Sequence, residues 1–265
     1  MRRTGGTREP TMKTGGGTVL IKALIFDMDG LLVETESIHI RTFEEFLRRK
    51  GIVPPEGYTE GLVGYSIAEN IEAIKRDLGL KGDSGELGRE RNDLYLEILK
   101  GSEIVPLAGV EELLGFAEAQ GLKKAVCSSS ERRQLEIVLP RLLAATGRAT
   151  GPEEFFDAIV YGDGRKRAKP EPDLYVACAD ALRMEAGECL AFEDSVVGAQ
   201  AAAAAGMAVV AVPNPFSKGQ REWPAACVVS SLAQVLEKGL LRGAGRGRAV
   251  FVTGGDARAT KNGGI

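Results

Sequence analysis

Short apolar segments alternate with longer amphipathic segments over most of the chain after residue 104. The apolar segments predict strands near residues 125–127, 158–161, 189–192, 208–212 and 227–229. The segments between them predict helices over residues 110–120, 132–143, 173–183, 196–205 and 232–237. Because strands and helices alternate, we expect right-handed crossovers and an α/β fold, with a doubly wound, Rossmann-like parallel sheet covered by helices on both faces.

The pattern before residue 104 is different. An apolar run predicts a first strand over residues 21–26, and no convincing strand follows it between residues 34 and 102. The helical period there predicts helices over residues 37–50, 66–78 and 86–99. We therefore expect a small α-helical cap domain, residues 34–103, inserted after the first strand of an α/β core made of residues 19–33 and 104–238.

Both ends of the chain lack hydrophobic periodicity. Residues 1–18 are rich in Gly, Thr and Arg, which predicts a disordered leader. Residues 239–265 carry Arg and Gly without pattern, which predicts a flexible tail in which residues 250–252 could form a stray strand.

Composition narrows the classes of partner. A formal net charge of −3 over 265 residues gives no sign of nucleic acid or an anionic membrane as a partner. The longest nearly unbroken apolar stretch, residues 201–212, is too short to span a bilayer. The four cysteines are scattered without metal-binding spacing. We therefore expect free thiols in a reducing, cytoplasmic setting and no secretory signal.

Two aspartates end the first predicted strand. Asp27 and Asp29 are one residue apart, so their side chains should point to the same side of an extended chain. Gly30 then allows the chain to turn sharply. Aspartates also favour ordinary turns. Directly after a fully apolar strand, however, the pair is well placed for chemistry in the crevice above an open α/β sheet.

Other polar side chains follow further predicted strands. Ser128 follows the second strand, Lys169 follows the third with prolines on either side of Glu171, and Glu193 and Asp194 follow the fourth. These residues could instead have purely structural roles. Asp194 and one serine of residues 128–130 could cap helices, and Lys169 could be a solvated surface lysine. Carboxylates without His or Cys partners suit Mg²⁺, and a cation together with a lysine suits a phosphoryl group.

The order and spacing of these residues resemble the haloacid dehalogenase-like hydrolase superfamily. The resemblance covers roughly residues 21–237. The helical insertion resembles the cap of its β-phosphoglucomutase-like and phosphoglycolate phosphatase-like branch. It implies that Asp27 is the nucleophile that becomes an aspartyl-phosphate, and that Asp29 is the general acid and then the base.

The same resemblance implies the remaining roles. Ser128 and the Ser129 backbone would bind the phosphoryl group, and Lys169 would balance charge between nucleophile and phosphate. Mg²⁺ would be held by Asp27, the Asp29 backbone carbonyl and Asp194, with Glu193 assisting. The resemblance also implies a monomer.

Three further residues are cap candidates. His39, the single histidine, is either structural or near the substrate. Gly64 and Tyr65 belong either to a cap loop that faces the substrate or to an ordinary loop before a helix.

The function expected from all this is a Mg²⁺-dependent phosphatase for a small phosphorylated metabolite, such as a sugar phosphate or phosphoglycolate. One alternative is a phosphomutase of the β-phosphoglucomutase type. Those enzymes grip a second phosphate with a Lys before the cap-loop Gly and an Arg three residues after it, where this chain has Val63 and Ile67. The other alternative is a non-catalytic binding protein on the same fold. Nothing in the sequence specifies the substrate.

Overall fold

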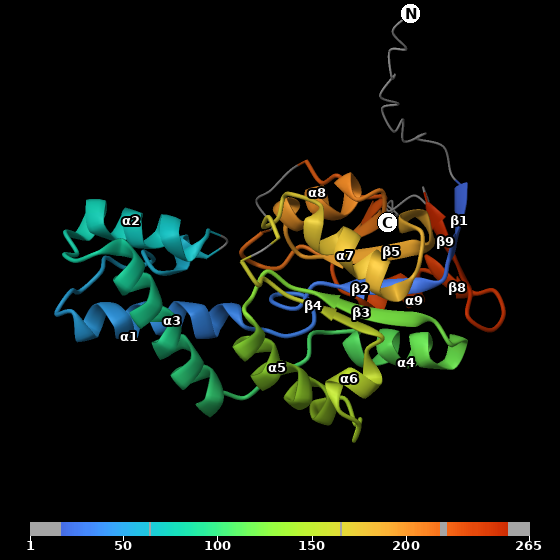
Figure 1. Cartoon of the computed structure of the whole chain (residues 1–265), viewed down its shortest axis with the longest axis horizontal. Coiled ribbons are helices and arrows are strands. Elements are labelled where there is room, and N and C mark those ends of the chain that lie inside the picture. Colours follow the sequence, from blue (N-terminus) through green and yellow to red (C-terminus); the bar gives the residue numbers. More distant parts are fainter. Residues whose placement is uncertain (1–16, 64, 165, 218–221, 254–265) are drawn as a thin grey trace, which may run out of the picture.

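The core of the protein is a six-stranded parallel sheet. The computed structural model describes residues 17–63, 65–164, 166–217 and 222–253. The order in the sheet is β4-β3-β2-β5-β6-β7, with every neighbouring pair parallel. The strands are β2 (Ala23–Phe26), β3 (Lys123–Cys127), β4 (Ala158–Val160), β5 (Cys189–Glu193), β6 (Ala208–Ala211) and β7 (Cys227–Val228). The predicted α/β fold is confirmed (Figure 1).

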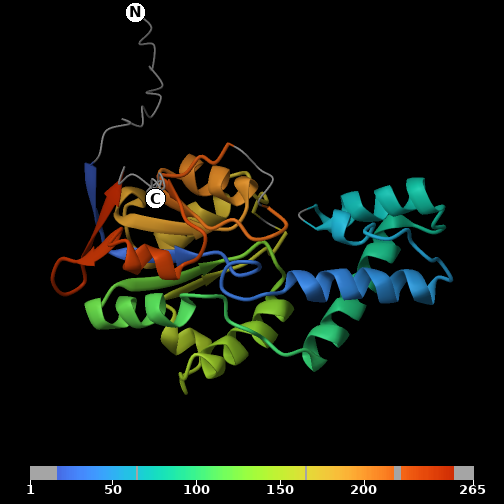
Figure 2. The same cartoon turned by 180° about the vertical axis from the view of Figure 1, so that it is seen from behind.

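Helices cover both faces of this sheet, because alternate residues of its strands are buried on opposite sides. On β2, Leu24 and Phe26 belong to the larger apolar cluster, and Ala23 and Ile25 to the smaller one. The larger cluster includes α4 (Val110–Gln120), α5 (Arg132–Ala145), α6 (Pro152–Phe155) and α9 (Ala233–Glu237). The smaller one includes α7 (Asp173–Leu182) and α8 (Val196–Ala204). Figures 1 and 2 show these two layers of helices with the sheet between them.

Three helices, called the cap below, follow β2 and lie beyond the carboxyl end of that strand (Figure 1). They are α1 (Glu36–Arg49), α2 (Ile67–Leu78) and α3 (Ser84–Gly101), with the short 3₁₀ helix η1 (Glu60–Leu62) before α2. They share an apolar cluster of their own. The two linkers to this helical segment run side by side, because Val33 pairs with Pro106 and the Glu34 N–H donates to the Val105 carbonyl at 3.1 Å.

The terminal segments form a second sheet, of which the sequence analysis anticipated only a possible strand over residues 250–252. Strand β9 (Ala249–Thr253) pairs antiparallel with both β1 (Gly17–Ile21) and β8 (Leu241–Gly243), at the end of the molecule opposite the three cap helices (Figure 2). The predicted flexible tail is therefore wrong for residues 239–253, and the predicted leader is wrong for residues 17 and 18. The rest of both segments lies outside the described residues.

The same sheet corrects the predicted first strand over residues 21–26. Ile21 ends β1, Lys22 breaks the run, and Ala23 begins β2. Both Ile21 and Phe251 are fully buried in the larger apolar cluster. This burial stabilises strands whose partners are more than 200 residues apart, and such a long-range pairing leaves no local periodic signal.

No helix in the described part of the chain is long and apolar enough to cross a membrane. Cys127, Cys178, Cys189 and Cys227 are all free thiols.

We expect Phe251→Ala to lower the free energy of unfolding by about 3–5 kcal/mol, because it deletes a fully buried aromatic ring and leaves a cavity. Leu20→Ala is the matched control in the same sheet, since Leu20 is 43% exposed and should cost less than about 1 kcal/mol. Urea titrations followed by circular dichroism measure both values. Equal effects of the two substitutions would show that the terminal sheet does not pack into the core.

Candidate active site

The carboxyl ends of three neighbouring strands bring the predicted site residues together. In the register of the sheet, Phe26 lies between Val126 and Phe192, so Asp27 follows β2 beside Cys127 and Glu193. The Lys169 ammonium group joins these strand ends. It donates to Asp27 Oδ1 at 2.5 Å, to Glu193 Oε1 at 2.7 Å and to the Cys127 carbonyl at 3.1 Å. Lys169 is thus a buried member of the acidic cluster and not a solvated surface lysine.

Glu193 is fully buried and both of its carboxylate oxygens have partners. Its Oε1 accepts a hydrogen bond from the Tyr175 hydroxyl at 2.6 Å as well as from Lys169, and its Oε2 accepts from the Ser195 hydroxyl at 3.1 Å. The backbone of α8 comes so close that a Cβ on Gly198 would lie 2.1 Å from this carboxylate. These contacts indicate that Glu193 holds Lys169 in place.

The cluster of strand-end side chains contains more carboxylates than Lys169 alone can neutralise. Carboxylate oxygens of Asp27, Glu193 and Asp194 lie within 4.8 Å of one another. Burial, with the neighbouring Glu193 charge, raises the pKa of Asp27 to about 8 even though Lys169 acts in the opposite direction. Burial and the Asp27 charge also raise the pKa of Asp194. A hard divalent cation bound by these oxygens would relieve the repulsion, so the donor set fits a metal such as Mg²⁺.

Asp29 has a separate set of partners. Its carboxylate accepts hydrogen bonds from the Thr35 hydroxyl at 2.8 Å, the Ser130 hydroxyl at 2.7 Å and the Gln134 amide at 2.7 Å. Burial raises the pKa of Asp29, and these three hydrogen bonds oppose that rise. A carboxyl group with a raised pKa holds a proton more readily, which suits a general acid.

The two candidate phosphate ligands lie at the end of β3. Ser128 is buried, and its hydroxyl oxygen accepts a hydrogen bond from the Ser130 N–H at 3.0 Å. Ser129 is exposed. The segment after β4 packs tightly against this turn, because a Cβ on Gly162 would lie 2.4 Å from the Ser129 carbonyl oxygen. Both serines therefore sit at the same sheet edge as Asp27.

His39 lies on α1 at the base of the cap, where it pairs with an arginine. Arg91 donates to His39 Nδ1 at 2.7 Å, which leaves the proton of the neutral ring on Nε2. The imidazole stacks on the Tyr95 ring with centroids 4.2 Å apart. Burial and the Arg91 charge lower the pKa of His39 to about 3. His39 is therefore neutral at ordinary pH and is oriented by its neighbours.

Arg91 itself is an unusual buried cation. It is 1% exposed, its guanidinium group lies 4.3 Å from the Phe43 ring centroid, and burial lowers its pKa to about 10. It forms no ion pair with any carboxylate in the described part of the chain. Its Nε and the Tyr95 hydroxyl are buried and have no hydrogen-bond partner among the described residues.

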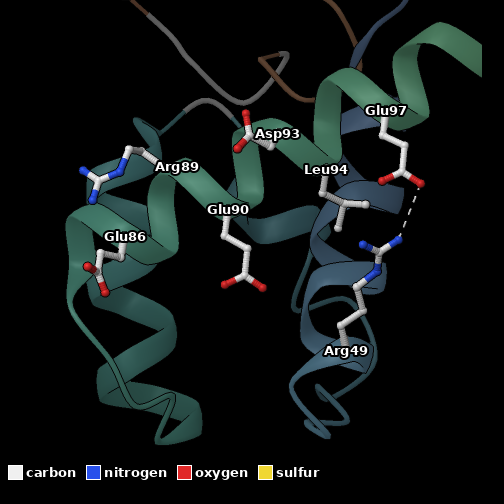
Figure 3. A pocket seen from close by; sticks show the side chains of 7 residues that line it. All are labelled: Arg49, Glu86, Arg89, Glu90, Asp93, Leu94 and Glu97. Carbon is white, nitrogen blue, oxygen red and sulfur yellow. Dashed lines mark ion pairs between the residues drawn. The ribbon is translucent and has the colours of Figure 1, made fainter.

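Two hollows lie on the cap, away from the strand-end carboxylates. Tyr65, which is 64% exposed, helps to line a hollow of about 600 Å³ between α2 and the loop that precedes it. Gly64 lies outside the described residues. The other hollow, of about 420 Å³, is flanked by α1 and α3 (Figure 3). There Arg49 reaches from α1 toward Glu97 of α3 at 3.7 Å. Neither hollow brings Tyr65 into contact with Asp27 or Lys169.

Sequence analysis missed several residues that hold this site together: Thr35, Gln134, Tyr175, Asn214 and Ser217. Only Asn214 had a usable signal. It precedes Pro215 just after the apolar run of β6, so it marks a turn at the carboxyl edge of another parallel strand. Tyr175 and Gln134 are ordinary helical positions, and their contacts arise only when distant segments pack.

Comparison with known proteins decides the family. The sequence model described as haloacid dehalogenase-like hydrolase matches residues 21–206. The chain belongs to this family. Protein CbbY of Rhodobacter capsulatus is 34% identical over 207 residues, which are 75% of this chain and 88% of that protein. Fructose-1-phosphate phosphatase YqaB of Escherichia coli is 33% identical over 193 residues, which are 71% of this chain and 95% of that protein.

A solved structure agrees with this assignment. The crystal structure of CbbY from Rhodobacter sphaeroides in complex with xylulose-1,5-bisphosphate has a TM-score of 0.69 and 26% identity, covering 81% of this chain and 96% of that one. The resemblance stated from the sequence motifs is therefore confirmed. So is the predicted enzyme class, a phosphoric monoester hydrolase.

The environment of His39 leads to a prediction about its protonation. Since the pKa of His39 is lowered to about 3, its ring should stay neutral between pH 8 and pH 5, where a free histidine with a pKa near 6.5 gains a proton. The chain has one histidine, so nitrogen-edited NMR of untagged protein reports one imidazole. The same chain unfolded in urea is the control and should titrate normally. A midpoint between pH 5 and 8 in the folded protein would contradict the buried His39–Arg91 pair.

Proposed function

We propose that this hydrolase is a Mg²⁺-dependent phosphatase of small phosphorylated sugars that works through an aspartyl-phosphate on Asp27. The observation that carries the proposal is the buried contact of Lys169 with Asp27, 2.5 Å long, beside the carboxylate of Asp194. A carboxylate can attack a phosphate dianion only if positive charge screens the repulsion between them. Lys169 supplies part of that charge.

A bound metal ion would complete the screening of the charge repulsion between the Asp27 carboxylate and the phosphate. Asp27 and Asp194 are the carboxylates that would hold Mg²⁺, together with the backbone carbonyl of Asp29. Bound Mg²⁺ supplies positive charge next to the oxygens of the phosphoryl group. Glu193 assists through Lys169, because the hydrogen bonds of its two oxygens are already made within the protein.

The two chemical steps use the two aspartates in turn. In the first, an Asp27 oxygen forms a bond to phosphorus while the bond from phosphorus to the sugar oxygen breaks, and Asp29 gives its proton to the leaving oxygen. In the second, Asp29 takes a proton from water, whose oxygen attacks phosphorus and releases Asp27 and inorganic phosphate. The raised pKa of Asp29 supports the first role, and its three hydrogen-bond donors support the second.

The phosphoryl group would lie between Lys169 and the turn after β3. The Ser128 hydroxyl and the Ser129 N–H are the neutral donors at that turn, and they follow the strand next to β2. Lys169 contacts the Cys127 carbonyl at the start of the same turn, so its ammonium group and these donors occupy one edge of the sheet.

The substrate class rests on the relatives and on the cap. YqaB is named for fructose 1-phosphate, and CbbY was crystallised with a sugar bisphosphate. At the base of the cap, Arg91 is a buried cation without a carboxylate partner among the described side chains, and it orients the neutral His39 ring. A positive charge that no carboxylate neutralises favours an anionic metabolite near it over an apolar one.

The phosphomutase alternative stays weaker for a reason visible in the sequence. Val63 and Ile67 stand where the mutases have the lysine and arginine that grip a second phosphate. Conversion of β-glucose 1-phosphate to the 6-phosphate in the presence of a bisphosphate activator would reverse this preference.

The proposal predicts that p-nitrophenyl phosphate is hydrolysed with Mg²⁺ and not after chelation with EDTA. Asp27→Asn should abolish turnover, because it removes the nucleophile. Asp29→Asn should lower kcat about 10²–10⁴-fold, which is the usual contribution of acid–base catalysis. It should still bind Mg²⁺ in calorimetry, since the proposed contact of Asp29 with the metal is a backbone oxygen.

Asp180→Asn is the matched control, because Asp180 is an exposed aspartate on α7 outside the site and its loss should leave kcat unchanged. Turnover by Asp27→Asn at the wild-type rate would exclude the aspartyl-phosphate. No turnover by any form of the protein, over a panel of sugar phosphates as well, would favour the non-catalytic alternative.

A further inference from the structure

The loop after β6 forms two hydrogen bonds with Asp194. The Asn214 side-chain amide donates to Asp194 Oδ2 at 2.7 Å, and the Ser217 hydroxyl donates to the Asp194 backbone carbonyl at 2.6 Å. Asp194 is buried, so both contacts are shielded from water. The side chain and the backbone of this carboxylate are therefore fixed from the same short loop.

The loop itself determines which way the Asn214 amide faces. Asn214 Oδ1 accepts hydrogen bonds from the backbone N–H groups of Phe216 at 2.9 Å and Ser217 at 3.0 Å. The Asn214 N–H in turn donates to the Ser217 hydroxyl at 3.0 Å. Because the oxygen of the amide is occupied within the loop, its NH₂ group must be the part that faces Asp194.

Gly30 encloses the same carboxylate oxygen from the other side. Its backbone has φ +75°, and a Cβ there would lie 2.4 Å from Asp194 Oδ2 and 2.7 Å from Asn214 Nδ2. Oδ2 is thus confined between the turn after Asp29 and the Asn214 amide. The other oxygen, Oδ1, accepts no hydrogen bond from any residue that the structure describes.

We propose that Asn214, supported by Ser217, is a positioning residue that makes Asp194 a one-oxygen ligand for the divalent cation. This inference rests on the proposed metal site and adds to it a means of selecting the metal. With Oδ2 held by Asn214 and Gly30, the carboxylate cannot turn to offer both oxygens to one ion. It offers Oδ1 alone.

One-oxygen ligation favours Mg²⁺ over Ca²⁺. Magnesium requires six oxygens in near-octahedral geometry at about 2.0–2.1 Å, which single carboxylate oxygens satisfy. Calcium accepts six to eight oxygens at about 2.3–2.6 Å and commonly takes both oxygens of a carboxylate. Release of Oδ2 should therefore cost Mg²⁺ affinity and benefit Ca²⁺ relative to it.

The test is calorimetric titration of the full chain with Mg²⁺ and, separately, with Ca²⁺. Asn214→Ala should weaken Mg²⁺ binding by about 10–100-fold, the usual effect of removing a residue that orients a metal ligand. It should weaken Ca²⁺ binding less, so that the ratio of the two dissociation constants moves toward Ca²⁺. A purely structural role of the loop would not change this ratio.

Phe216→Ala is the matched control in the same loop, since Phe216 is exposed and its hydrogen bond to Asn214 comes from the backbone N–H, which alanine keeps. Its affinities for both ions should equal those of the wild type. If Asn214→Ala does not fold, Ser217→Ala decides the question, because it removes only the hydroxyl that anchors the loop and should shift the ratio in the same direction.

Two results would overturn the inference, and they are distinguishable. Wild-type Mg²⁺ affinity in the folded Asn214→Ala variant, or an equal loss for both ions, would exclude selection by Asn214 while leaving the metal site intact. Failure of the wild type to bind Mg²⁺, with p-nitrophenyl phosphate turnover unaffected by EDTA, would remove the metal site and the inference with it.

Discussion

The crowding of carboxylates around Lys169 is the constraint on which the rest of the site depends. Oxygens of three carboxylates lie within 4.8 Å of one another, and one ammonium group cannot neutralise all three charges. Burial of unpaired charge costs several kcal/mol unless hydrogen bonds or ions compensate it. Surrounding side chains supply part of this compensation, because Tyr175 and Ser195 donate hydrogen bonds to Glu193 and Asn214 donates one to Asp194.

The parallel sheet explains how such a cluster can form at all. Strands β2, β3, β5 and β6 are neighbours, so the segments after their carboxyl ends meet at one edge although they come from distant parts of the sequence. The cap is coupled to this edge by Thr35, which precedes α1 and donates to Asp29. A displacement of α1 relative to the sheet would therefore disturb the carboxylate of the proposed general acid directly.

The sequence predicted the parts of the molecule whose signals are local. The helices and strands of the core came from periodicity, and Asp27, Lys169 and Asp194 came from polar residues that follow apolar strands. The terminal sheet was anticipated only as a possible strand over residues 250–252, because β1 and β9 lie next to glycine-rich segments and pair across almost the whole chain. The Arg91–His39 pair was missed because a charged residue on a helix looks solvent-facing until α1 and α3 pack together.

The polar groups at the edge of the sheet and those on the cap differ in how fully they are hydrogen-bonded. Lys169, Asp27 and Glu193 are joined by hydrogen bonds at the carboxyl edge of the sheet, so the core preorganises the groups that we propose to react. Arg91 Nε and the Tyr95 hydroxyl, both on α3, have no hydrogen-bond partner among the residues that the structure describes. Polar atoms left unpaired at a buried surface favour any partner that supplies the missing hydrogen bonds. The proposed division, with chemistry on the core and substrate recognition on the cap, agrees with this distribution of satisfied and unsatisfied polar groups.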